Sequence, residues 1–277
     1  MIPRFLSFLS VFLLFSPAAY PAESPRPERI VSINLCADEL LLRLADPSQI
    51  AGVTAYPKTA DAEAVLAKAP GIRKIRGSTE EVLALKPDLV LAGRFTHQGT
   101  VRFLERMGIP VLAVPVPRSF EEIYQNLKLV AAAAGYPSRG EETIGQMRSA
   151  LAGAGWGAGN PPKVLFLQSE GYVPGRETFE DDILRIAGAV NLADSMGIRE
   201  YGRMSLEAIL FGKPDLLIFT EDQKDRASVR GSILSHPAIR KGTFSAKTVV
   251  LPACLLHCGS PSSVAAVRLL REKMEEK

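Results

Sequence analysis

Short apolar runs alternate with amphipathic stretches along most of the chain. Runs such as RIVSI (29–33), IAGVTA (50–55) and IPVLAVP (109–115) are short and rich in β-branched residues, which is typical of buried strands. Between such runs apolar residues recur at helical spacing, and the leucines of NLCADELLLRLA (34–45) form one buried side of a helix. Strands and helices that alternate with short Gly and Pro breaks predict parallel sheets covered by helices on both faces.

The alternation begins a second time at KVLFLQS (163–169), so the sequence predicts two similar α/β halves. Further elements are expected as helices at 60–69, 103–108, 177–189, 232–240 and from about Ser262, and as strands at 215–220 and 248–253.

A helical connector is expected between the halves, with one helix over 119–134 and a second over about 138–152. Neither a strand nor a Gly/Ser linker interrupts it, so the connector is stiff and large hinge closure is not expected. The expected boundaries are a first lobe over 23–118, a connector over 119–160 and a second lobe over 161–277.

One helix-to-strand unit occurs twice, as STEEVLALKPDLVLAG (78–93) and as SLEAILFGKPDLLIFT (205–220). Each copy opens on a serine suited to cap a helix and places a glutamate in the first turn, where the helix dipole favours negative charge. A proline then ends each helix before the apolar strand. One copy alone would be an ordinary well-capped unit, whereas two copies predict equivalent exposed glutamates that relate both lobes to one partner. The matching positions are Ser78 and Ser205, Glu80 and Glu207, and Pro87 and Pro214.

The first 22 residues, MIPRFLSFLSVFLLFSPAAYPA, have the order of a secretory signal. One basic residue precedes an apolar run from Phe5 to Phe15, and small residues follow. The run is too short to cross a bilayer, which needs about 20 residues. A signal peptide cleaved near Ala19 or Ala22 is therefore expected, with a retained N-terminal anchor as the alternative. The mature protein is expected to be soluble and located outside the cytoplasm.

Composition narrows the classes of function. The 33 Lys and Arg residues nearly balance the 30 Asp and Glu residues and are scattered along the chain, so nucleic acid is not an expected partner. Three cysteines could supply one disulfide and one spare thiol in an oxidising compartment, and the sequence does not choose the pair among Cys36, Cys254 and Cys258. A zinc site is the alternative, but the chain has neither a second close Cys pair nor a nearby His pair.

The common enzyme motifs are absent from the sequence. It has no G-x-S-x-G elbow, no phosphate-binding G-x-x-x-x-G-K-[ST] loop, no H-E-x-x-H and no dinucleotide fingerprint. A secreted hydrolase with a different Ser/His/Asp set is the enzyme alternative, because a fold does not determine a function.

The chain resembles, over nearly its full mature length, the periplasmic substrate-binding proteins of ABC importers for vitamin B12 and ferric siderophores. The similar pieces, in order, are RIVSINLCADELLLRLADPSQIAGVT, EEVLALKPDLVLAG, FLQSEGYVPGRETFEDDILRIAGAVNLAD, LEAILFGKPDLLIF and HPAIR. The resemblance implies two α/β lobes of the type III kind joined by a rigid helix, with the ligand in the cleft between them. It also implies a monomer without catalytic activity or cofactor, whose glutamates Glu80 and Glu207 dock against arginines of the permease dimer.

Ligand-binding residues are expected in loops at the carboxyl ends of the strands, where open parallel sheets bind ligands. These are Asn34, Cys36, Tyr56, Arg76, Arg94 and His97 in the first lobe and Tyr172, Tyr201, Arg203 and His257 in the second. Each also has a purely structural alternative: the tyrosines Tyr56 and Tyr172 as loop caps, the histidines as solvated side chains and the arginines in surface pairs.

The residue types in these loops bear on the cargo. Tyr201 matches the position at which the B12 binders carry a tryptophan that packs on the ligand, but their first-lobe tryptophan has no counterpart near Arg76. Arginines suit the carboxylates of a ferric chelate or of haem. A bare transition-metal ion would need clusters of His and carboxylates that the sequence does not show. The expected function is capture of a corrinoid or ferric siderophore for an ABC importer, with haem as the alternative cargo.

Overall fold

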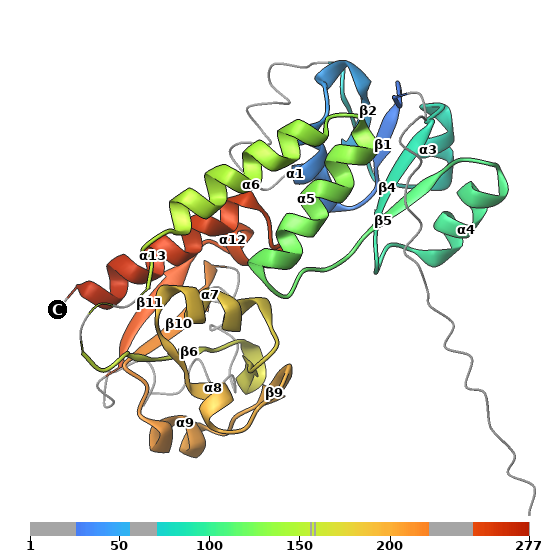
Figure 1. The fold of residues 1–277 in the computed structure, drawn as a ribbon. Helices are drawn as coiled ribbons and strands as arrows, with labels where there is room; N and C mark the ends of the chain where they lie inside the picture. The colour runs from blue at the N-terminus through green and yellow to red at the C-terminus, as the bar shows by residue number, and fades with distance from the viewer. Residues whose placement is uncertain (1–25, 56–70, 156, 158, 222–245, 277) are drawn as a thin grey trace, which may run out of the picture.

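The computed structural model describes residues 26–55, 71–155, 157, 159–221 and 246–276 (Figure 1). Within these ranges each half of the chain forms a parallel β-sheet with helices packed against it. The first sheet has the order β3-β2-β1-β4-β5, with β1 (Ile30–Ser32), β2 (Ile50–Thr54), β3 (Arg73–Ile75), β4 (Leu89–Gly93) and β5 (Val111–Val114). The second has the order β11-β10-β6-β8, with β6 (Lys163–Phe166), β8 (Val190–Asn191), β10 (Leu216–Thr220) and β11 (Lys247–Leu251).

The two sheets share one arrangement of strands. In the first sheet β1 lies between β2 and β4, and in the second β6 lies between β8 and β10. All neighbouring strands of both sheets run parallel. The equivalent strands β4 and β10 are buried at every residue, which explains their continuous apolar sequences. The predicted fold class, two α/β halves with parallel sheets, is confirmed.

Helices connect the strands in each half. The first half contains α1 (Leu35–Leu44), α3 (Thr79–Ala84), α4 (Gln98–Arg106) and the 3₁₀ turn η1 (Pro47–Gln49). The second half contains α7 (Phe179–Ala187), α8 (Leu192–Ser195), α9 (Leu206–Gly212), α12 (Cys254–His257), α13 (Val264–Glu275) and the turns η2 (Ser169–Gly171) and η4 (Pro261–Ser263). No helix in the described ranges is long and apolar enough to cross a membrane.

Two antiparallel helices, α5 (Phe120–Ala134) and α6 (Pro137–Leu151), join the halves (Figure 1). The chain reverses between them at Gly135, whose φ of 85° lies in the left-handed region that favours glycine. The helices pack closely where Gly140 faces α5, because a Cβ there would lie 2.8 Å from that of Ala131. At its start α5 also contacts α7, since the Phe120 N–H donates to Asp182 at 2.8 Å and the Phe120 and Phe179 rings lie 5.4 Å apart.

One continuous hydrophobic core links the sheets through this helical pair. It includes Leu41 from the first half, Ile123 and Ile144 from α5 and α6, and Ile183 and Ile218 from the second half, all at most 1% exposed. Domain movement would have to break this packing, which supports the stiff connection expected from the sequence.

Most of the predicted elements occur within one to a few residues of the expected positions. The helix expected at 103–108 is the second part of α4, which begins earlier, at Gln98. The strands β3 and β8 and the antiparallel ribbon of β7 (Tyr172–Pro174) and β9 (Tyr201–Arg203) were not predicted. The helices expected at 60–69 and 232–240 lie outside the described residues.

Candidate ligand-binding cleft

The repeated units have the same local structure in both halves. The hydroxyl oxygen of Ser78 accepts the Glu81 N–H at the start of α3, and that of Ser205 accepts the Ala208 N–H at the start of α9. The glutamates predicted to be exposed, Glu80 and Glu207, lie in the first turns of these helices and are exposed. Hydrogen bonds from its own backbone N–H and from Ser78 hold the pKa of Glu80 below its ordinary value.

The equivalence continues through the Lys-Pro-Asp segment that follows each helix. Lys86 and Lys213 precede the prolines with φ of 47° and 49°, a left-handed conformation uncommon for residues other than glycine. Asp88 then accepts the Arg29 N–H at 3.0 Å, just before β1, and Asp215 accepts the Lys163 N–H at 2.7 Å, at the start of β6. The carboxylate of each unit therefore ties its strand to the central strand beside it.

A cavity of about 360 Å³ lies at the junction of the halves, near the carboxyl ends of their strands. The first half supplies the segment that follows β5, and the second supplies residues after β6, on α7, on β9 and around α12. Its lining is mixed, with apolar, aromatic, amide, carboxylate and imidazole groups. The lining residues are Val116, Pro117, Gln168, Phe179, Glu180, Tyr201, Leu256, His257, Cys258 and Gly259.

Two side chains in this cavity, Glu180 and Tyr201, have pKa values displaced from their ordinary values. The Tyr201 hydroxyl donates to the Glu180 carboxylate, with oxygen–oxygen distances of 3.1 and 3.4 Å. Burial raises the pKa of Glu180 above its ordinary value, and burial together with the neighbouring carboxylate raises the pKa of Tyr201. The Tyr201 side chain is nevertheless 56% exposed, so its ring is accessible to a ligand.

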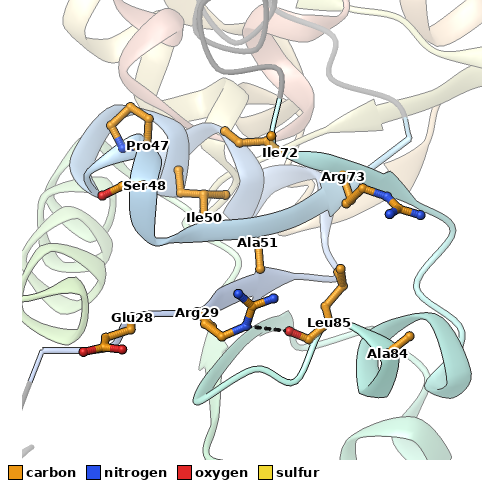
Figure 2. Close-up of a pocket in the computed structure, with 11 residues that line it drawn as sticks. Glu28, Arg29, Pro47, Ser48, Ile50, Ala51, Ile72, Arg73, Ala84 and Leu85 are labelled. Atoms are coloured by element: carbon orange, nitrogen blue, oxygen red, sulfur yellow. Dashed lines mark hydrogen bonds between the residues drawn. The ribbon is translucent and has the colours of Figure 1, made fainter.

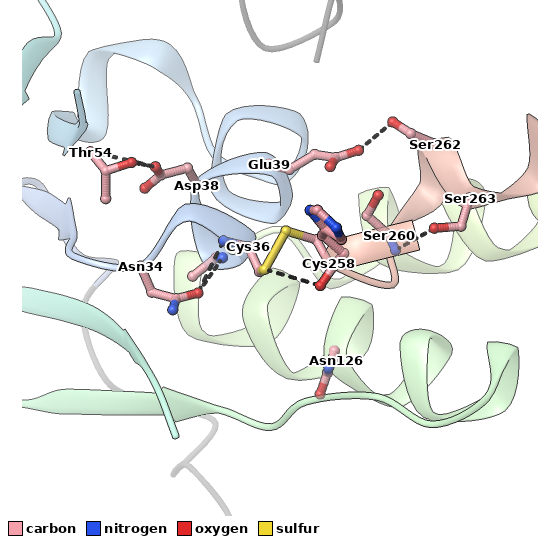
Figure 3. The surroundings of a disulfide bond; sticks show 12 residues. Asn34, Cys36, Asp38, Glu39, Thr54, Asn126, Cys258, Ser260, Ser262 and Ser263 are labelled. Carbon is pink, nitrogen blue, oxygen red and sulfur yellow. Dashed lines mark hydrogen bonds between the residues drawn. A yellow bond between two sulfur atoms is a disulfide. The ribbon is translucent and has the colours of Figure 1, made fainter. Parts of the chain in front are cut away.

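A disulfide between Cys36 and Cys258 joins the two halves (Figure 3), and Cys258 also lines the cavity. Cys36 lies in the first turn of α1 in the first half, Cys258 follows α12 in the second, and their Cα atoms lie 5.0 Å apart. One helical turn further along α1, the Glu39 carboxylate accepts a hydrogen bond from the Ser262 hydroxyl, a second link across the junction. Cys254 is the free cysteine, and burial raises the pKa of its thiol.

Of the sequence-predicted ligand residues, Tyr201 and His257 line the cavity, and Cys36 lies behind its wall as the disulfide partner of Cys258. Tyr172 and Arg203 instead contact each other, with the guanidinium carbon 4.4 Å from the ring centroid. Tyr56 lies outside the described residues.

The remaining first-lobe candidates are not among the cavity's lining residues. The Asn34 side chain caps α1 by accepting the N–H groups of Cys36 and Ala37 at 3.0 and 3.1 Å. The His97 ring caps α4 by accepting the Thr100 N–H. Arg76 and Arg94 are exposed on the first half.

Three chemically important lining residues, Gln168, Glu180 and Cys258, were not predicted as ligand contacts. Gln168 lies just beyond β6, at a strand end where the carboxyl-edge rule applies, so that rule could have selected it. Glu180 lies in the first turn of α7, and no signal in the sequence distinguishes it from the neighbouring carboxylates Asp181 and Asp182.

A second, larger cavity of about 590 Å³ lies at the opposite end of the first sheet (Figure 2). It is lined by residues near the amino ends of β1 and β2, among them Arg29, whose Nε donates to the Leu85 carbonyl at 2.8 Å. Ligands of open parallel sheets bind at the carboxyl ends of the strands. The smaller cavity between the halves is therefore the candidate ligand site.

Two α/β halves, a stiff helical connection and a cavity at the junction define the architecture of a two-lobed ligand-binding protein. A family profile described as Periplasmic binding protein matches residues 30–250. The chain therefore belongs to the periplasmic binding protein family.

Among curated proteins, the chain is 28% identical over 216 residues to "Uncharacterized ABC transporter substrate-binding lipoprotein YvrC" of Bacillus subtilis, which covers 73% of this chain. It is 27% identical over 246 residues to "Cobalamin-binding protein" of Halobacterium salinarum, which covers 85% of this chain. The matched region spans 66% of the length of each of these two relatives.

Among solved structures, the apo form of "Periplasmic heme-binding protein RhuT" from Roseiflexus sp. RS-1 is similar, with a TM-score of 0.71 and 26% sequence identity. The similarity covers 88% of this chain and 97% of that one. Similar proteins are thus named for binding different ligands, cobalamin in one case and haem in another.

Proposed function

We propose that this protein captures a metal chelate, either a corrinoid or a ferric siderophore, and delivers it to the permease of an ABC importer. The observation that carries the proposal is the cavity at the junction of the halves, which combines an accessible tyrosine ring with convergent polar groups. A continuous core through the connector suits capture and release by small movements. The names of the curated relatives support an ABC-type binding role for the fold.

A chelate suits the described residues better than a bare metal ion. Within the described ranges no group of three or more His, Cys, Asp or Glu residues could hold a metal ion. A bare transition-metal ion requires such a group, whereas a chelate brings its own ligands and needs an aromatic surface and hydrogen-bonding groups.

Haem is the second candidate cargo. The cavity is lined by Tyr201 and His257, and both phenolate and imidazole are side chains that bind haem iron in proteins. The structural similarity to a protein named for haem binding also favours this alternative.

The two repeated helix starts are proposed as the surfaces that dock on the permease. Glu80 and Glu207 are exposed at equivalent positions of the two halves, as a dimeric permease with one arginine-bearing site per subunit would require. Exposed charge pairs of this kind determine orientation and association rate more than affinity.

The proposal also includes export by a signal peptide, the boundaries of the lobes and a monomeric state. Residues 1–22 act as a signal that directs the protein to the periplasm. The lobes comprise residues 23–118 and 161–277, with 119–160 as the connector, and the protein acts as a monomer without catalytic activity.

The proposal is tested by comparing two tyrosines of the same ribbon. Tyr201→Ala removes the ring that lines the cavity and should weaken binding of the chelate about fivefold, because ring contacts of this kind contribute about 1 kcal/mol. Tyr172→Ala is the matched control, since Tyr172 is also exposed but does not line the cavity, and it should bind as the wild type does. Equal affinity of all three proteins, measured by calorimetric titration, would place the chelate elsewhere.

A further inference from the structure

The charge of the cavity distinguishes between the classes of chelate. Its described lining contains one carboxylate, Glu180, and no lysine or arginine. The other polar side chains in the lining are Gln168, Tyr201 and His257. Within the described part of the chain, the wall of the site is therefore rich in hydrogen-bond acceptors and lacks a fixed positive charge.

The Glu180 carboxylate lines the cavity and can accept a hydrogen bond from a ligand. Its carboxylate accepts the Tyr201 hydroxyl at 3.1 Å, and an ionised carboxylate has about four acceptor positions. Burial raises the pKa of Glu180, because the charged carboxylate is partly removed from water. A ligand N–H would replace the lost water, whereas a ligand carboxylate would place a second negative charge beside one that is already poorly solvated.

Four arginines in the described part of the chain were candidates for a positive charge at the site, and each has another partner or position. Arg118 lies close enough to influence Tyr201 but pairs with Glu200 at 3.0 Å. Arg203 lies over the Tyr172 ring, and neither residue lines the cavity. Arg76 and Arg94 are exposed on the first half and are likewise absent from the described lining.

We propose that Glu180 is the residue that determines specificity in this cavity, accepting N–H donors of an uncharged or cationic chelate and disfavouring chelates that carry carboxylates. The inference rests on the proposed function and narrows it. Its substrate class is an amide-bearing chelate, such as a corrinoid with intact side-chain amides or a cationic ferric hydroxamate. Haem, with two propionates, is disfavoured by the same group.

The test uses one pair of probes that differ mainly in charge and a second pair that differ in charge and in the type of chelate. Cyanocobalamin is compared with its monocarboxylic acid derivatives, in which one side-chain amide has been hydrolysed, and ferrioxamine B is compared with haemin. The wild-type protein should bind cyanocobalamin or ferrioxamine B at least about tenfold more tightly than the negatively charged member of its pair, because like charges at close range strongly disfavour association.

Glu180→Gln keeps an acceptor for the Tyr201 hydroxyl and removes the charge, so the fold should be retained. In this variant the ratio of affinities within the pair should fall by about tenfold. Glu221→Gln is the matched control, because it removes an exposed carboxylate of the same half that does not line the cavity, and it should leave the ratio unchanged.

The outcomes separate this inference from the function on which it rests. Haemin or a monocarboxylic derivative bound as tightly as its partner would overturn the role of Glu180 while leaving chelate capture intact. An unchanged ratio in Glu180→Gln would do the same. No binding of any of the four probes by the wild-type protein would overturn the proposed function itself, and the inference with it.

Discussion

The first and second halves of the molecule are most alike where a helix enters the sheet and least alike around the cavity. In both halves a serine caps the helix, a lysine adopts the left-handed backbone conformation, and an aspartate accepts a hydrogen bond from the backbone at the neighbouring strand. These residues occupy matching positions. Around the cavity the described polar side chains all come from the second half, and the first half supplies Val116 and Pro117. The repeat thus specifies scaffold and exposed surface, while the ligand chemistry is specific to one half.

The two halves are joined by one disulfide, by the helices α5 and α6, and by the hydrogen bond from Ser262 to Glu39. Each of the following changes either breaks the equivalence of the halves or tests how far it extends.

The largest effect is expected from removing the disulfide. The double variant Cys36→Ser, Cys258→Ser opens a covalent loop that spans 222 residues, and the free energy of unfolding should fall by about 2–5 kcal/mol. Denaturant unfolding under non-reducing conditions measures the change. Cys254→Ser, at the free and half-buried cysteine, is the control and should change stability by less than about 1 kcal/mol. Three alkylatable thiols in the unreduced wild-type protein would contradict the pairing.

The next effect concerns Asp38, a buried carboxyl in α1 of the first half. The side chain is 1% exposed, and burial raises its pKa from 3.8 to about 6 despite hydrogen bonds from Ser32 and Thr54. Because the folded protein binds this proton more tightly than the unfolded chain does, its contribution to stability is present below about pH 4 and is lost as pH rises through about 6.

This loss should amount to about 2–3 kcal/mol of unfolding free energy between the protonated and ionised states. Asp38→Asn should flatten the dependence over the same pH range, as measured by urea unfolding at a series of pH values. An equal slope in the wild type and the variant would show that Asp38 is not the titrating group.

A smaller effect is expected at the two strand-linking aspartates. Asp88→Ala and Asp215→Ala each remove a carboxylate that accepts a backbone N–H of the neighbouring strand, and each should cost about 1–2 kcal/mol. The Asp88 carboxylate also accepts the Glu28 N–H at 2.6 Å, so the loss at Asp88 should equal or exceed the loss at Asp215. If the halves are equivalent at this point, both losses should be measurable and should add in the double variant. Thermal unfolding of the three variants measures this, and a large loss in one half alone would limit the equivalence.

The smallest effect on the protein itself is expected at Glu80 and Glu207. Replacing both with alanine should leave ligand affinity and stability nearly unchanged, because both side chains are exposed and outside the cavity. The double variant should fail to stimulate ATP hydrolysis by the reconstituted transporter, and each single variant should weaken docking about two- to fivefold. Loss of chelate binding in the double variant would instead place these residues in the ligand site.

The architecture could be predicted from the sequence because its signals are local. Apolar runs such as LVLAG and LLIFT became the buried strands β4 and β10, and the connector helices α5 and α6 occupy nearly the expected residues. The three-residue strand β3 was missed because its sequence, Arg-Lys-Ile, has too few apolar positions to show a pattern.

The candidate site was harder to predict because its contacts are not local. Asn34 and His97 follow strands, as ligand residues do, but the same positions precede helices, and both side chains serve as N-caps. Tyr201 meets Glu180 because the β7–β9 ribbon brings residues 21 positions apart together, and Cys36 pairs with Cys258 across the whole chain. The periodicity of apolar residues gives no information about contacts between residues so far apart in the sequence.

The central claim, capture of a metal chelate between the halves, is tested most directly by the absorption spectrum of retained ligand. The mature protein is incubated separately with cyanocobalamin, ferric siderophores and haemin, desalted, and scanned. A retained corrinoid or siderophore spectrum, diminished in Tyr201→Ala, is the predicted result. A colourless protein across the whole panel would contradict the claim.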